Sequence, residues 1–195
     1  MLSWHASVDD MAPTFPHPVQ LLDLAFLGSP LQPDVQADLG DCLRAQLQAA
    51  ENLLRPGQGQ AMLVPSGVTM DATGVLSTAA DYEVDYAYDD EAVITALNNM
   101  SGEIRRQAEK LRCFALGYYV RMRPEGGPQE VSLRRSTEWQ QKDRTPPHGT
   151  LDAVAVDLEH RAGVAITVFM PYGWQESALF VGRPLAIPSR RRIWA

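Results

Sequence analysis

The chain has 195 residues, 45% of them hydrophobic, and its 24 acidic against 17 basic side chains give a net charge of −7. This length is typical of one domain with its own core, and the acidic balance argues against a general nucleic-acid-binding protein. The longest early apolar stretch, residues 19–27, is far below the ~20 residues of a membrane span. We therefore expect one soluble domain over residues 1–195, with no membrane contact and no nucleic-acid partner.

The first residues lack the basic and apolar regions of a secretory signal, which favours the cytoplasm. The two cysteines, Cys42 and Cys113, are accordingly expected to be free and buried. Charge is unevenly distributed, because residues 1–100 carry 14 acids against two arginines (net −12) and residues 101–195 carry 15 basic side chains against 10 acids (net +5). The two halves of the chain should therefore attract each other.

The N-terminal third is predicted to be mostly helical. Residues 1–18 hold three prolines without periodicity, which indicates an irregular Pro-rich arm, and a short apolar helix is expected over 19–27. Over 33–55, apolar side chains recur at three- and four-residue steps, the pattern of an amphipathic helix. They are Val35, Leu39, Cys42, Leu43, Leu47, Ala50 and Leu54.

Short strands are expected next, over 60–64 and 75–78, with a turn over 65–73 between them. The segment 81–91 then alternates tyrosine or valine with aspartate or glutamate, which predicts a half-buried strand with one acidic face. Two interpretations stay open for this face. The basic half of the same chain neutralises it, or it is a docking surface for a cationic partner.

A second long helix is predicted from Asp89 or Asp90 to about Arg112, with apolar positions at Ile94, Leu97, Ile104, Ala108 and Leu111. A strand follows over 113–123, with its large apolar side chains on one parity.

The three-residue group 161–163 ends in glycine, which suits a hairpin loop of a type I turn and a bulge. This loop pairs residue 160 with 164, 158 with 166, 156 with 168 and 154 with 170, which gathers the large aliphatic side chains on one face.

These elements predict the α+β class: a mainly antiparallel sheet with a C-terminal meander, and two long helices packed on one of its faces. The arginines at 190–192 are interpreted as a solvated tail, or as a tail folded onto the acidic half, in preference to a phosphate-binding patch.

The first candidate site is the second face of the sheet, where small residues surround a polar set. The small residues are Ala115, Gly117, Ala153, Ala155 and Ala165, and the polar set is Tyr119, Arg121, Asp157, Glu159 and Thr167. Two carboxylates at i and i+2 could act as an acid–base pair, whereas cross-strand pairing with arginine is the structural alternative. Small side chains also allow a helix, a ligand or a second subunit to approach closely.

The second candidate site is an aromatic rim at the strand ends, formed by Trp139, His148, Tyr172 and Trp174 beside the polar loop 136–150. No cofactor is expected, because the chain has no Walker, dinucleotide or nucleophile-elbow motif. No metal is expected either, because the four histidines are widely spaced.

These observations favour a non-enzymatic binding or interaction protein. We expect a homodimer formed through the small-residue face, with Arg121 of one subunit against Asp157 or Glu159 of the other, and a small molecule or a protein as a further ligand. The alternative is a small hydrolase- or isomerase-like enzyme that uses Asp157, Glu159 and His148.

Overall fold

The computed structural model describes residues 31–54, 65–79, 90–122, 151–175, 178–181 and 184–194. Several expectations lie outside these residues and stay predictions. They are the Pro-rich arm, the helix over 19–27, the strand over 60–64, residues 81–89 of the acidic segment, and the loop 136–150.

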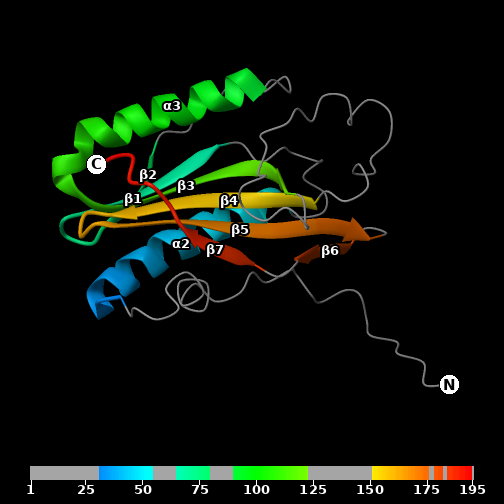
Figure 1. Ribbon diagram of the computed structural model, residues 1–195, viewed down its shortest axis with the longest axis horizontal. Coiled ribbons are helices and arrows are strands. Elements are labelled where there is room, and N and C mark those ends of the chain that lie inside the picture. The colour runs from blue at the N-terminus through cyan, green and yellow to red at the C-terminus, as the bar shows by residue number, and fades with distance from the viewer. Residues whose placement is uncertain are drawn as a thin grey trace.

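The described strands form a single antiparallel sheet in the order β2-β1-β3-β4-β5-β6, and β7 also pairs with β5 (Figure 1). The strands are β1 (Ser66–Asp71), β2 (Leu76–Ala79), β3 (Leu111–Met122), β4 (Leu151–His160), β5 (Val164–Gln175), β6 (Ala178–Val181) and β7 (Leu185–Pro188). The helices are α2 (Pro33–Leu54) and α3 (Asp90–Gln107), the latter continued by the 3-10 turn η1 (Ala108–Lys110). The α+β class, the antiparallel sheet and the C-terminal meander are therefore confirmed.

Helix α2 covers one face of the sheet through the stripe that the sequence predicts. The predicted positions Val35, Leu39, Cys42, Leu43, Leu47 and Ala50 are buried, and the side chain of the seventh, Leu54, is outside the described residues. The buried side chains pack against alternate residues of the central strands, among them Val154, Val156, Leu158, Ile166 and Val168. Because each of these side chains is at most 3% exposed, this face forms the main core.

Helix α3 lies on the opposite face, so the expectation that both helices share one face was wrong (Figure 1). The reason is the register of β3 and β4, which pairs Phe114 with Glu159 and Leu116 with Asp157. The large side chains of β3 therefore point away from α2 and form a second core with Met100 and Ile104 of α3. In the same helix Ile94 was expected to be buried, but it is 42% exposed.

The β4–β5 hairpin has the predicted register, from His160 opposite Val164 to Val154 opposite Met170. Its turn closes with the Gly163 amide donating to the His160 carbonyl at 2.9 Å. Gly163 has φ +96°, as the three-residue loop requires.

Two regions differ from the expected elements. Residues 66–71 form strand β1, although they were predicted to be a turn, because their backbone pairs on one side with β2 and on the other with β3. The turn lies at 72–75 instead. Strands β6 and β7, which no pattern predicted, add to the outer edge of β5.

Candidate functional site

Two buried carboxylates of β4 form the centre of the most polar region on the α3 face. Asp157 is 6% exposed and Glu159 is 2% exposed. They lie two residues apart on one strand and so project from the same face of the sheet. Each carboxylate is held by a different set of partners. Both sets include members of the segment 190–194, which we call the strap.

Glu159 binds the main chain of the strap. Its Oε2 accepts hydrogen bonds from the amides of Arg192 at 2.7 Å and Ile193 at 3.1 Å, and its Oε1 accepts from the amide of Trp194 at 2.9 Å. The Nε atom of Arg191 lies 3.7 Å from Oε1. Charge-assisted hydrogen bonds of this kind are about twice as strong as neutral ones, so Glu159 is the principal anchor of the strap.

Asp157 binds a side chain of the strap together with two hydroxyl groups. Thr167 donates to Oδ1 at 2.6 Å and Tyr118 donates to Oδ2 at 3.2 Å, while Nη1 of Arg192 lies 3.1 Å from Oδ2. Burial, and then the negative charge of Asp157, raise the pKa of the Tyr118 phenol well above its ordinary value. Tyr118 therefore stays protonated and acts as a hydrogen-bond donor.

The end of the strap packs into the apolar interface between α3 and the sheet. Ile193 is 9% exposed and belongs to the cluster of Met100, Ile104, Leu111, Phe114 and Leu116. The ring of Trp194 lies 5.9 Å from that of Phe114, measured between centroids, and its Nε1 donates to the carbonyl of Ala108 at 3.3 Å. From α3, Nη2 of Arg105 donates to the carbonyl of Arg192 at 2.8 Å.

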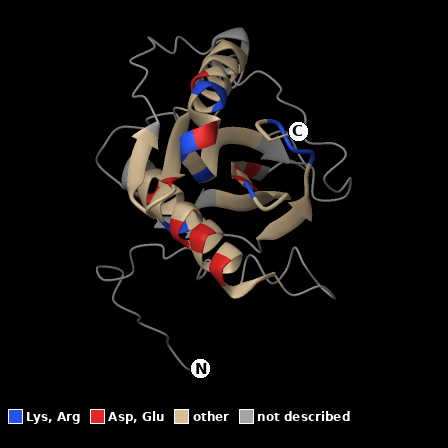
Figure 2. Cartoon of the chain, turned by 90° about the vertical axis from the view of Figure 1, so that its left-hand side faces the viewer, with Lys and Arg blue, Asp and Glu red and all other residues tan. Residues whose placement is uncertain are grey.

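Among the described residues, Arg191 and Arg192 pair with carboxylates of the basic half of the chain, whereas one interpretation expected the tail to fold onto the acidic half. These carboxylates belong to Asp157 and Glu159, and Figure 2 shows the basic segment beside the C label on the side of the sheet away from the acidic positions of α2. The net charge of each half did not predict the position of the arginines at 190–192. Two nearby carboxylates attract these side chains more strongly than the average charge of a distant segment does, because salt screens charges over long distances.

The structure separates the residues of the first candidate site into two groups. Asp157, Glu159 and Thr167 lie together on the α3 face. Tyr119 and Arg121 lie on the α2 face, because β3 pairs them with Val154 and Asp152. The Tyr119 hydroxyl donates to Oδ1 of Asp152 at 2.5 Å. The side chain of Arg121 is outside the described residues.

The small residues of that site are divided in the same way. Ala153 and Ala155 face α3 and are 0% exposed, whereas Ala115 faces α2. The chain itself therefore covers Ala153 and Ala155, so neither of these two side chains is exposed to a second subunit.

The aromatic rim cannot be assembled from the described residues. Tyr172 is buried in the α2-side core, and Trp174 lies opposite Leu179 of β6. Trp139 and His148 lie outside the described residues. The rim stays a prediction.

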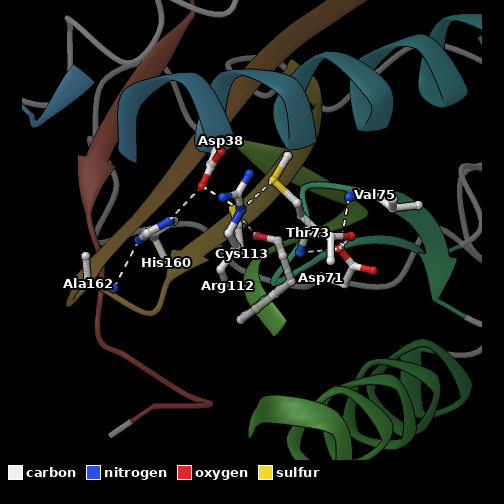
Figure 3. Close-up of polar contacts among 10 residues, drawn as sticks. Asp38, Asp71, Thr73, Val75, Arg112, Cys113, His160 and Ala162 are labelled. Carbon is white, nitrogen blue, oxygen red and sulfur yellow. Dashed lines mark hydrogen bonds and ion pairs between the residues drawn. The ribbon is translucent and has the colours of Figure 1, made fainter. Parts of the chain in front are cut away.

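A second polar cluster, which the sequence did not predict, joins α2 to the sheet (Figure 3). Oδ2 of Asp38 lies 3.0 Å from Nε of Arg112 and 3.2 Å from Nε2 of His160. The Nδ1 atom of His160 accepts the Ala162 amide at 3.0 Å, so Nε2 carries the proton that Asp38 accepts. The sequence feature that could have indicated this cluster is Asp38 itself, a charged residue on the apolar stripe of the helix between Val35 and Cys42.

This cluster is structural, because both ring nitrogens of His160 are occupied by partners of the fold. It connects α2, the start of β3 and the hairpin turn. The nearby thiols of Cys42 and Cys113 are free and buried, and burial, followed by contact with Cys42, raises the pKa of Cys113. A thiol in this state is a poor nucleophile.

Among the residues that the structure describes, no group of three or more His, Cys, Asp or Glu side chains could hold a metal ion. The described helices include none that is long and apolar enough to cross a membrane. The chain matches no protein-family model, no curated protein and no solved structure.

Proposed function

We propose that this protein is a non-enzymatic interaction protein that binds an extended peptide segment at the place between α3 and the sheet that residues 190–194 fill, which we call the groove. The observation that carries the proposal is the strap, which lies in this groove and is held there by its main chain and its side chains. The strap occupies the groove as a bound peptide would.

The main-chain contacts support binding of a separate segment. Glu159 accepts three consecutive amides, and Arg105 donates to a carbonyl of the same stretch. Any extended peptide offers these groups, whatever its side chains are. The groove is therefore suited to segments other than residues 190–194.

The same contacts favour binding over the alternative enzyme. While the strap is in place, the carboxylates of Asp157 and Glu159 accept hydrogen bonds from Thr167, Tyr118 and the strap amides. A general base has to reach a substrate proton within hydrogen-bond distance. Neither carboxylate is placed to do so beneath the strap.

Self-association, if it occurs, has to use a different surface from the one first expected. Ala153 and Ala155 are buried beneath α3, so two copies would associate by exchanging straps, with Arg192 of one copy on Asp157 of the other.

We also propose a cytoplasmic location, which the two free thiols support.

Hydrogen–deuterium exchange tests whether the strap opens. We expect the amides of Ile193 and Trp194 to exchange through a local opening, at a lower free energy than the amide of Val156 in the core. Glu159→Gln should speed their exchange and leave the β4–β5 core amides unchanged. Glu109→Gln, at an exposed position on η1, is the matched control. If the strap amides exchange only when the whole protein unfolds, the strap is a fixed part of the core and the proposal is wrong.

A further inference from the structure

We infer that the strap is an intramolecular pseudo-ligand, and that the partner of the groove is a peptide segment in which arginine is followed by a large aliphatic and then an aromatic residue. This inference rests on the proposed function, since it names the partner of the same groove. It is drawn from the contact that each strap side chain makes.

The arginine position is recognised by charge. Nη1 of Arg192 lies 3.1 Å from Oδ2 of Asp157, and Thr167 and Tyr118 hold that carboxylate in place. Arg191 contributes a longer contact, 3.7 Å from Glu159. A buried carboxylate that is already oriented selects a cationic side chain against a neutral or acidic one.

The next two positions are recognised by shape. Ile193 enters the cluster formed by Ile104, Phe114 and Leu116, and a polar side chain at this point would lose its hydrogen bonds to water without finding a partner. Trp194 packs on Phe114 and donates from Nε1 to the Ala108 carbonyl. This donor specifies an aromatic residue with a polar edge.

The strap competes with any partner from within the chain. It follows directly after β7, which ends at Pro188 and is fixed to β5, and the amide of Ser189 donates to the carbonyl of Ala165 at 2.9 Å. A tethered segment of this kind acts at an effective concentration on the order of millimolar. A peptide with the same contacts therefore binds weakly to the intact protein and tightly to a protein whose strap is weakened.

The test uses the full chain and a fluorescein-labelled hexapeptide, Arg-Arg-Arg-Ile-Trp-Ala, in a fluorescence anisotropy titration. We expect Ile193→Ala to bind this probe ~10-fold or more tightly than the wild type, because the weakened strap leaves the groove more often. Trp194→Ala, at a half-buried position, is the second variant in case Ile193→Ala does not fold. Arg44→Ala, at an exposed position of α2 outside the strap, is the matched control and should bind as the wild type does.

Two further measurements assign the binding to the groove. Adding Glu159→Gln to Ile193→Ala should abolish the gain, because the main-chain anchor is lost. A scrambled probe, Ile-Arg-Ala-Arg-Trp-Arg, should bind weakly to every variant. Equal binding of the two probes would overturn the inference, because charge alone would then explain it.

The same samples distinguish failure of the inference from failure of the proposed function. If exchange shows that the strap of Ile193→Ala opens but no probe binds, the partner chemistry is wrong and the groove still opens. If the strap does not open, the proposed function fails as well. A wild type that sediments as a dimer, and becomes a monomer with Glu159→Gln, would replace the foreign partner with a second copy of this chain.

Discussion

Gly117 of β3 and Gln46 of α2 are packed so closely that a side chain fits at position 117 only when Gln46 moves. A Cβ atom built on Gly117 would lie 2.8 Å from Cδ of Gln46 and closer still to its amide nitrogen. Gln46 is only 1% exposed, and its Nε2 donates to the hydroxyl of Ser66 at 2.5 Å. The small residue that we expected to leave room for a partner therefore leaves room for a glutamine of the same chain.

Gly117→Ala should lower the free energy of unfolding by about 1–3 kcal/mol, because the added methyl group overpacks the interface and displaces Gln46. Denaturant titration followed by circular dichroism measures the change. Gly102→Ala is the matched control, since a Cβ at position 102 meets nothing within 4 Å. In the interior of α3 it should stabilise by about 0.5–1 kcal/mol. A neutral effect of Gly117→Ala would mean that α2 shifts freely on the sheet.

Gly163→Ala should destabilise by ~1 kcal/mol or more, for a conformational reason and not a packing one. Gly163 has φ +96°, and the nearest atom to an added Cβ is 3.9 Å away. Space is therefore available, while the backbone conformation is unfavourable for an L side chain. Gly163→Asn should cost less, because asparagine tolerates positive φ. Equal losses for alanine and asparagine would contradict this explanation.

Leu158→Ala and Ile166→Ala should each lower the free energy of unfolding by about 2–5 kcal/mol. The two side chains pair across the hairpin and are 1% and 0% exposed, so truncation leaves a cavity beneath α2. Val75→Ala, at a position that is 57% exposed, should change stability by less than about 0.5 kcal/mol. Chemical denaturation of the three variants checks this order, and a small loss for either core variant would show that α2 collapses into the space.

The β1–β2 turn should make stability depend on pH through Asp71. Its Oδ1 accepts from the Thr73 hydroxyl at 2.6 Å and from the Thr73 and Val75 amides at 2.8 and 3.0 Å (Figure 3). These bonds, the Thr73 hydroxyl first, hold the pKa of Asp71 below its ordinary value of 3.8. A lowered pKa means that the stabilisation is present above the unfolded-state value and is lost as the pH falls through the folded-state value.

Asp71→Asn should therefore lower the thermal midpoint at about pH 7 and leave it unchanged at about pH 2, where the native carboxyl is also neutral. Thr73→Val, which removes the first donor, should bring the pKa of Asp71 closer to its ordinary value in an NMR titration. Equal destabilisation by Asp71→Asn at both pH values would show that the shape of the side chain matters and its charge does not.

The sequence predicted best where the local pattern and the packing agree. In the hairpin, one glycine selects the loop and the register places the large aliphatic residues from Val154 to Met170 on one face, so local and global preferences coincide. In α2, a stripe with helical spacing predicts the buried face correctly as far as Ala50. Both predictions needed only residues close together in the chain.

The sequence did not predict features that depend on contacts between two segments far apart in the chain. The face of β3 could not be derived from its own alternation, because both parities are buried and only pairing with β4 decides which parity meets α2. Asp157 and Glu159 were identified as a polar pair, but their partner is a stretch about 30 residues further on. No periodicity connects a carboxylate to the backbone amides that it binds.

The position of α2 has a consequence for the order in which the chain is synthesised. The apolar face of this helix, complete at Leu54, packs on β4, which begins only at Leu151. Ribosomes add ~5–20 residues per second, so this face waits ~5–20 s for the strands that cover it. During that interval the nascent chain displays an apolar surface that the finished protein buries, and this surface is available to a chaperone.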